Sequence, residues 1–214
     1  MMFDVSRTTA NDLFHYWLPI LRDLLPSSLL EEWDKSIKGD EFVKELLTSY
    51  QLLVDSSEQG RERPKEQEEQ EKYYSGKKQT HTFKNQFITL PHGEDIVDVI
   101  VGERGPEADV NLLRRQQQNF SDEQAFKGDK AYQGAERTKT PYKKPPKKKL
   151  SPEKKEKNKQ LSQSRIYVEH LIRIVKIFRI ASERFRLHSS TYSQVMLVIC
   201  GLVRLRIGAF RFSF

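Results

Sequence analysis

The sequence is nearly devoid of cysteine. Its one cysteine, Cys200, cannot form a disulfide framework, and it cannot supply the several thiolates of a structural zinc site. Because it lies within the apolar run 195–203, we interpret it as a small buried hydrophobic residue. A free, buried cysteine is typical of a protein in the reducing cytoplasm, which is where we expect this chain.

Long apolar runs are also missing. The longest is the nine-residue run 195–203, far short of the ~20 residues that a helix needs to span a bilayer. The first residues, Met1 to Asp4, show neither the basic flank nor the apolar centre of a signal peptide. We therefore expect no membrane partner.

Charge is plentiful but unevenly distributed. Only 36% of the residues are hydrophobic and 31% are charged, with a net charge of +7. Residues 1–138 are acidic, whereas residues 139–159 hold ten lysines against Glu153 and Glu156, and residues 160–214 are also basic. This pattern suits a protein that binds cations in one part and a polyanion in another. A basic protein that is merely soluble is the alternative.

The N-terminal 50 residues have helical patterning. Apolar residues recur at helix spacing, and Pro26 separates a first helix from a second one that begins near Leu29. Before the first helix, residues 5–10 place Ser6 at a capping position, similar to the turn and recognition helix of a helix-turn-helix. An ordinary capped amphipathic helix is the alternative. We predict a helical segment over 1–48 with a partial helix-turn-helix.

Strand patterns replace the helical ones from residue 51 onward. Strands are expected at 51–54, 78–90, 96–101 and 124–127, with a turn at His92-Gly93, a helix over 108–119 and a long helix over 161–183. The lysine- and proline-rich stretch 139–159 is expected to be a mobile basic linker. These elements predict an α/β domain with a mixed sheet and flanking helices.

Three acidic residues stand apart from the charge runs. Asp55 and Asp129 each follow a predicted strand, so both should project from strand ends, where open sheets tend to place their sites. Glu169 lies on the last helix, where Arg165, Arg173 and Lys176 fall within about 80° of it around the axis. The alternatives are ordinary turn capping for the two aspartates and a surface ion pair with Arg173 for Glu169.

Four sequence motifs resemble those of DDE-type insertion-sequence transposases. Asp55 stands in Val-Asp-Ser-Ser-Glu before Arg-Glu-Arg-Pro, and residues 73–85 are similar to the family's second strand pair. Residues 128–134, Gly-Asp-Lys-Ala-Tyr-Gln-Gly, resemble the second-aspartate motif, and residues 165–176 fit the pattern R-x3-E-x6-K. The resemblance extends from residue 5 to about 207. Two positions depart from it, because Ser162 and Ala108 replace the tyrosine and histidine that are usual there.

The resemblance implies a ribonuclease-H-like catalytic domain over 49–214 that cleaves DNA and transfers its strands. Asp55, Asp129 and Glu169 would hold divalent ions, Mg²⁺ or Mn²⁺, because carboxylate oxygens suit these hard cations. The residues implied to contact DNA are Arg165, Lys176, Lys147, Lys148 and Lys149. We further expect transposon ends and target DNA as partners. The expected location is the bacterial cytoplasm, in association with the nucleoid, and the expected assembly is a homodimer.

The same resemblance suggests a shortened family member, since the helices that usually precede the recognition helix are not in this sequence. One alternative function is therefore a nucleic-acid-binding remnant that has lost catalysis. A second alternative is a metal-dependent nuclease of similar fold that does not transpose DNA. The retained acidic triad favours catalysis over the binding remnant.

Overall fold

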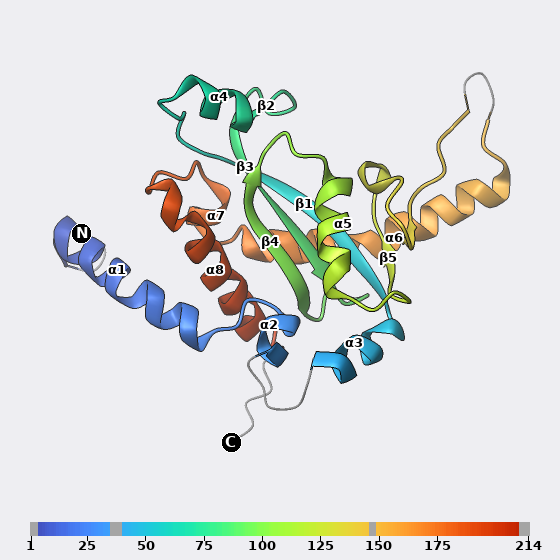
Figure 1. Ribbon diagram of the computed structural model, residues 1–214, viewed down its shortest axis with the longest axis horizontal. Coiled ribbons are helices and arrows are strands. Elements are labelled where there is room, and N and C mark those ends of the chain that lie inside the picture. Colours follow the sequence, from blue (N-terminus) through green and yellow to red (C-terminus); the bar gives the residue numbers. More distant parts are fainter. Residues whose placement is uncertain (1–3, 35–39, 146–148, 210–214) are drawn as a thin grey trace.

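The computed structural model describes residues 4–34, 40–145 and 149–209 (Figure 1). Lys147 and Lys148 lie outside these ranges, so their predicted contact with DNA falls on residues that the structure does not describe. Lys149 is described and exposed in the segment before the last long helix.

A mixed sheet forms the centre of the molecule. Its strands are β1 (Gln51–Gly60), β2 (Tyr74–Ser75), β3 (Thr80–Thr89), β4 (Ile96–Arg104), β5 (Ala125–Lys127) and β6 (Thr138–Lys139). β1, β3 and β4 pair antiparallel, while β5 and β6 add in parallel on the other side of β1. Three antiparallel strands followed by two parallel ones are consistent with a ribonuclease-H-like fold. The predicted α/β class with a mixed sheet is confirmed.

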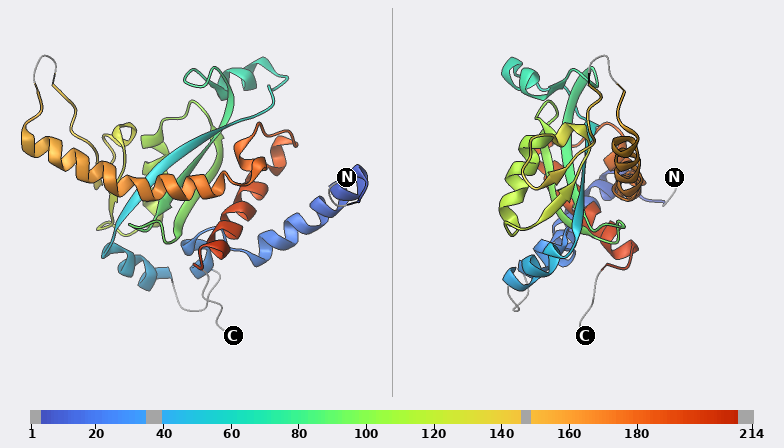
Figure 2. Two further views of the ribbon diagram at one scale, coloured as in Figure 1. Left: turned by 180° about the vertical axis from the view of Figure 1, so that it is seen from behind. Right: turned by 90° about the vertical axis from the view of Figure 1, so that its right-hand side faces the viewer.

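Helices cover both faces of this sheet (Figure 2). α5 (Asp109–Gln116) lies on one face, and α6 (Pro152–Val175) and α8 (Tyr192–Arg206) lie on the other. The shorter elements of the second half are α7 (Arg179–Ser182) and the 3₁₀ turns η1 (Gln117–Asn119), η2 (Lys130–Tyr132) and η3 (Ser189–Thr191). Because successive strand residues point to opposite faces, Leu53 joins the core beneath α6 and α8, whereas Leu52 and Val54 join the core on the α5 side.

The first predicted N-terminal helix is α1 (Arg7–Leu24), and the second begins at the predicted place as α2 (Leu29–Asp34). A separate helix, α3 (Asp40–Thr48), precedes β1, and α4 (Gln67–Tyr73) follows it. Ser6 caps α1 by accepting a hydrogen bond from the Thr9 amide at 3.0 Å. α1 packs along α8 through the buried Leu18. The division into a 1–48 segment and a 49–214 domain stays a prediction, and so does the helix-turn-helix.

The apolar run 195–203 lies in α8 and is mostly buried, with Cys200 fully enclosed. Burial raises the pKa of the Cys200 thiol to about 12, which keeps it protonated and unreactive. Among the described residues, no helix combines the length and the apolar character that crossing a membrane would require.

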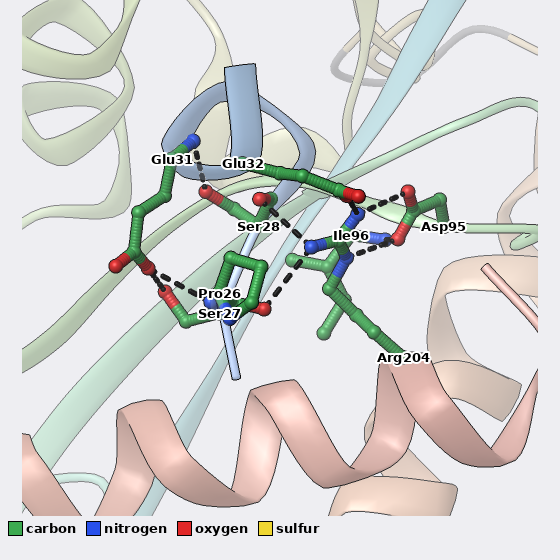
Figure 3. Close-up of polar contacts among 8 residues, drawn as sticks. All are labelled: Pro26, Ser27, Ser28, Glu31, Glu32, Asp95, Ile96 and Arg204. Atoms are coloured by element: carbon green, nitrogen blue, oxygen red, sulfur yellow. Dashed lines mark hydrogen bonds and ion pairs between the residues drawn. The ribbon is translucent and has the colours of Figure 1, made fainter. Parts of the chain in front are cut away.

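Arg204 near the end of α8 ties the C-terminal helix to two distant segments (Figure 3). Its guanidinium is fully buried and donates to both carboxylate oxygens of Asp95, at 2.6 and 2.8 Å. It also donates to the carbonyls of Pro26 and Ser28 and to the Glu32 carboxylate. One side chain therefore joins α8, the turn before β4 and the start of α2.

The long helix α6 differs from the sequence prediction at both ends. α6 begins at Pro152 rather than at 161, because Ser151 caps it and proline fits the first helical turn. The interpretation of 139–159 as a mobile linker is therefore wrong for 152–159, where the lysines are good helix formers. The helix ends at Val175. Gln59 donates hydrogen bonds to the carbonyl of Ile180 in the short α7 that follows and to the carbonyl of Glu183 just after it.

Candidate metal-binding carboxylate site

Asp55 lies within a strand rather than after one. β1 continues to Gly60 because it pairs with β3 without interruption from Leu53 to Gly60, so the prediction that the strand ends at residue 54 is wrong. Two residues beyond Leu53, the Asp55 side chain points to the same face of the sheet, toward α6. It is therefore held on a paired backbone with its carboxylate beneath a helix.

Arg165 of α6 connects two of the three predicted acids. Its Nη2 lies 3.3 Å from Oδ2 of Asp55 and 3.6 Å from Oε1 of Glu169. The side chains of Arg165 and Asp55 are only 16% and 18% exposed, whereas Glu169 is 44% exposed. Glu169 thus pairs with the arginine one turn before it, and the expected alternative partner was Arg173. The strand and the helix bring both carboxylates to one guanidinium.

Asp129 occupies the turn that follows β5. Gly128 before it permits close packing, because a Cβ at this position would lie 2.6 Å from the ring of Tyr132. With Tyr132 buried there, Asp129 becomes the cap of η2 and accepts a hydrogen bond from the Ala131 amide at 2.8 Å. The capping role expected as the alternative is therefore present, and it fixes the direction of the carboxylate.

The electrostatics of Asp55 indicate that the three acids share one environment. Burial raises the pKa of Asp55, opposed by the nearby Arg165 charge and by the hydrogen bond from the Ser56 amide, and raised again by the charges of Asp129 and Glu169. The two neighbouring carboxylates therefore disfavour the ionised form of Asp55. A cation placed among them would relieve this.

The donor set fits a hard divalent cation. All three acids offer carboxylate oxygens, which Mg²⁺ and Mn²⁺ prefer, and Cys200, the only cysteine, is buried in α8. In the described part of the chain, however, no three acidic, histidine or cysteine side chains already stand in a metal-holding group. The Arg165 guanidinium contacts both Asp55 and Glu169, and its buried Nε has no hydrogen-bond partner among the described residues. Arg165 therefore supplies the positive charge there, with one donor free for a further ligand.

Lys176 also lies within the electrostatic reach of Asp55. It caps the end of α6, and its pKa is lowered by partial burial and by the charge of Lys78, with Asp55 acting in the opposite direction. The R-x3-E-x6-K residues thus gather near Asp55, whereas Lys149 lies in the segment before α6.

Sequence reasoning missed a polar cluster on the opposite face of β1. Ser56 points toward α5, where its hydroxyl donates to Asp109 at 2.8 Å, and buried Lys84 pairs with Asp109 at 3.0 Å. Tyr132 lies beside them, and its pKa is raised well above the usual value by burial and by the charges of Asp109 and Asp55. The one sequence signal was Asp109 itself, at the first position of a predicted helix. The hydrogen bond to Asp109 holds Ser56, the residue next to Asp55, in place.

Comparisons with known proteins agree on one family. Residues 54–204 match the family model described as DDE superfamily endonuclease. The chain is also 37% identical over 139 residues to a probable transposase for insertion sequence element IS702 from Microchaete diplosiphon. That match covers 63% of this chain and 49% of the relative, so the chain matches about half the length of that protein. No solved structure matches the chain.

Proposed function

The chain belongs to the DDE superfamily endonuclease family, and from this membership we propose that it cleaves DNA and transfers its strands as an insertion-sequence transposase. The observation that carries the proposal is the meeting of Asp55 and Glu169 at the Arg165 guanidinium, with Asp129 acting on the same carboxylate. Two acids from different elements share one guanidinium, and the charge of a third acts on the more buried of the two. A cation shared by the three would account for this arrangement.

Asp55, Asp129 and Glu169 would hold the divalent ions of this site. When bound, two such ions activate the attacking oxygen and stabilise charge on the phosphoryl group. Asp55, held on the paired strand β1, would be the ligand with the least freedom to move, while the more exposed Glu169 on α6 would have more freedom to adjust to the ion. Arg165 and Lys176 would then turn to the DNA phosphates, because carboxylates that bind metal no longer need the guanidinium as counter-ion.

The finer parts of the proposal concern the reaction and the setting. The same site would use a DNA 3′-hydroxyl in place of water to join transposon ends to target DNA. DNA is the proposed partner, and the bacterial cytoplasm, in association with the nucleoid, is the proposed location. A homodimer would allow two DNA ends to be processed together.

The reaction is tested with the parent protein and labelled DNA that carries free 3′-hydroxyl ends. We expect strand cleavage with Mg²⁺ and joining of the labelled ends to a plasmid target, and neither product when EDTA replaces Mg²⁺. Gel electrophoresis separates nicked, cut and joined products.

Each other outcome of this assay identifies a competing function. Cleavage without joining contradicts transposition and favours the nuclease of similar fold. Bound DNA that is neither cut nor joined contradicts catalysis and favours the binding remnant.

A further inference from the structure

A second site lies beside the carboxylates, between the sheet edge and the first half of α6. A cavity of about 730 Å³ opens there, lined by residues from β1, β5, β6, the segment after β6, and α6. Four of its lining residues are lysines, and none is an aspartate or glutamate: Lys127, Lys139, Lys143 and Lys157. In Figure 1 the first half of α6 extends past the sheet.

Hydrogen bonds and strand pairing hold the lining residues of this cavity in place. The Tyr142 amide donates to the Asn158 side chain at 2.8 Å, and Asn158 donates back to the Tyr142 carbonyl at 3.1 Å. This pair of hydrogen bonds fastens the segment after β6 to α6 and closes the cavity on that side. On the opposite wall, Lys127 and Lys139 stand at paired positions of β5 and β6.

In the described part of the chain, the four lysines lack a carboxylate partner. We propose that this lysine groove binds the phosphates of a single DNA strand next to the carboxylate site. The identity of the ligand as DNA rests on the proposed function, whereas the need for a polyanion rests on the groove alone.

Position and size favour a single strand. Lys127 precedes Asp129 by two residues, and the lining residue Leu161 lies one helical turn before Arg165, so the groove borders the acids along β5 and along α6. If spherical, a 730 Å³ cavity would be about 11 Å across, close to the ~12 Å width of the major groove alone, and a whole duplex is wider than one of its grooves. A duplex cannot enter it, whereas one backbone with an unpaired base can.

Further features of the lining agree with this ligand. Tyr142 offers an aromatic ring at the wall, as in other grooves that follow single strands. Burial lowers the pKa of Lys127, and the neighbouring charge of Lys139 lowers it further, so a phosphate beside Lys127 would raise that pKa again. The groove therefore gains from an anion in the way that the carboxylates gain from a cation.

Binding of a fluorescent single-stranded oligonucleotide in EDTA tests the groove apart from catalysis. The double variant Lys127→Ala/Lys157→Ala removes two groove charges, and Lys155→Ala/Lys159→Ala removes two charges from the same helix outside the lining. At ~0.7 in logarithmic salt slope per phosphate contact, the groove variant should lose about 1.4 in slope and roughly 25-fold in affinity at 0.1 M salt. The control should lose less than about threefold.

Two further arms decide among the explanations. The substitutions Lys127→Arg/Lys157→Arg keep both charges and should retain binding, which separates lost charge from lost structure. A duplex of the same sequence should lose less affinity than the single strand does in the groove variant. Equal losses in the groove and control variants, or equal losses for duplex and single strand, would overturn the proposal. Because no metal is present, failure of cleavage leaves this result unaffected.

Discussion

Replacing Glu169 with glutamine should reduce Mg²⁺-dependent DNA cleavage by at least about a thousandfold while leaving DNA affinity equal or slightly higher. Glutamine keeps the size of the side chain but removes the negative charge that the proposed ions require. The same loss removes one repulsion of the phosphate backbone, so binding should not weaken. Cleavage rates at saturating DNA and anisotropy in EDTA measure the two effects separately.

The matched control is Glu183→Gln. Glu183 also pairs with an arginine four residues before it, Arg179, at 2.7 Å, but on α7. An exposed pair of this kind contributes only ~0.3–0.5 kcal/mol, so the control should cut DNA at the parent rate. If the Glu169 variant also kept the parent rate, Glu169 would be only a surface partner of Arg165.

The largest loss of stability is expected from Arg204→Met. Methionine fills much of the space but leaves the Asp95 carboxylate, which is only 7% exposed, without its buried partner. The carbonyls of Pro26 and Ser28 also lose their hydrogen-bond donor. Breaking a buried pair in this way costs about 3–5 kcal/mol, a large share of the 5–15 kcal/mol that stabilises a typical domain. Thermal unfolding should show Tm lower by roughly 10 °C.

Arg206→Met is the control on the same helix, because Arg206 is exposed and should change stability by less than about 0.5 kcal/mol. If Arg204→Met is recovered only as insoluble protein, Arg204→Lys provides a milder test. One ammonium group cannot reach all the acceptors that the guanidinium serves. The Tm of Arg204→Lys should therefore lie below the Tm of the parent and of the Arg206 variant, but above that of Arg204→Met. Equal Tm values for the position-204 and position-206 variants would show that the buried network contributes little.

The sequence predicted the α/β class and the mixed sheet better than it predicted where the elements end. Apolar runs reveal buried residues, and for this reason β1 was expected to stop where Asp55 interrupts its run. Pairing with β3 continued the strand instead, since β3 supplies backbone partners whatever the side chain at position 55. Strand length was set by a partner more than 20 residues away, which local patterning cannot show.

The basic stretch shows the opposite limit. Its composition suggested a linker, yet Ser151 and Pro152 form a helix start, and the lysines that follow lie on α6. Amino-acid composition indicates whether a segment can bury apolar side chains. The second half of α6 packs on the core and holds the helix in place, so the first half can be helical without burying apolar side chains of its own. The lysine groove follows from that helix and could not have been predicted without it.

Arg204 and Lys84 were hidden for a different reason. Each is a charged residue within or beside apolar sequence, where a surface position is the ordinary expectation. Each is buried because its partner comes from elsewhere in the chain, Asp95 for Arg204 and Asp109 for Lys84. Such pairs depend on the fold that they stabilise.

Binding of Mn²⁺ to the parent protein and to Asp55→Asn tests the central claim most directly. The electron paramagnetic resonance signal of free Mn²⁺ falls as the ion binds, so a titration gives the affinity without any cleavage. Asp122→Asn serves as the control, because Asp122 is fully exposed and its ion pair is with Arg137 rather than with Arg165. We expect saturable binding by the parent and the Asp122 variant, and affinity at least about tenfold weaker for Asp55→Asn. Equal Mn²⁺ binding by all three proteins would contradict the carboxylate site.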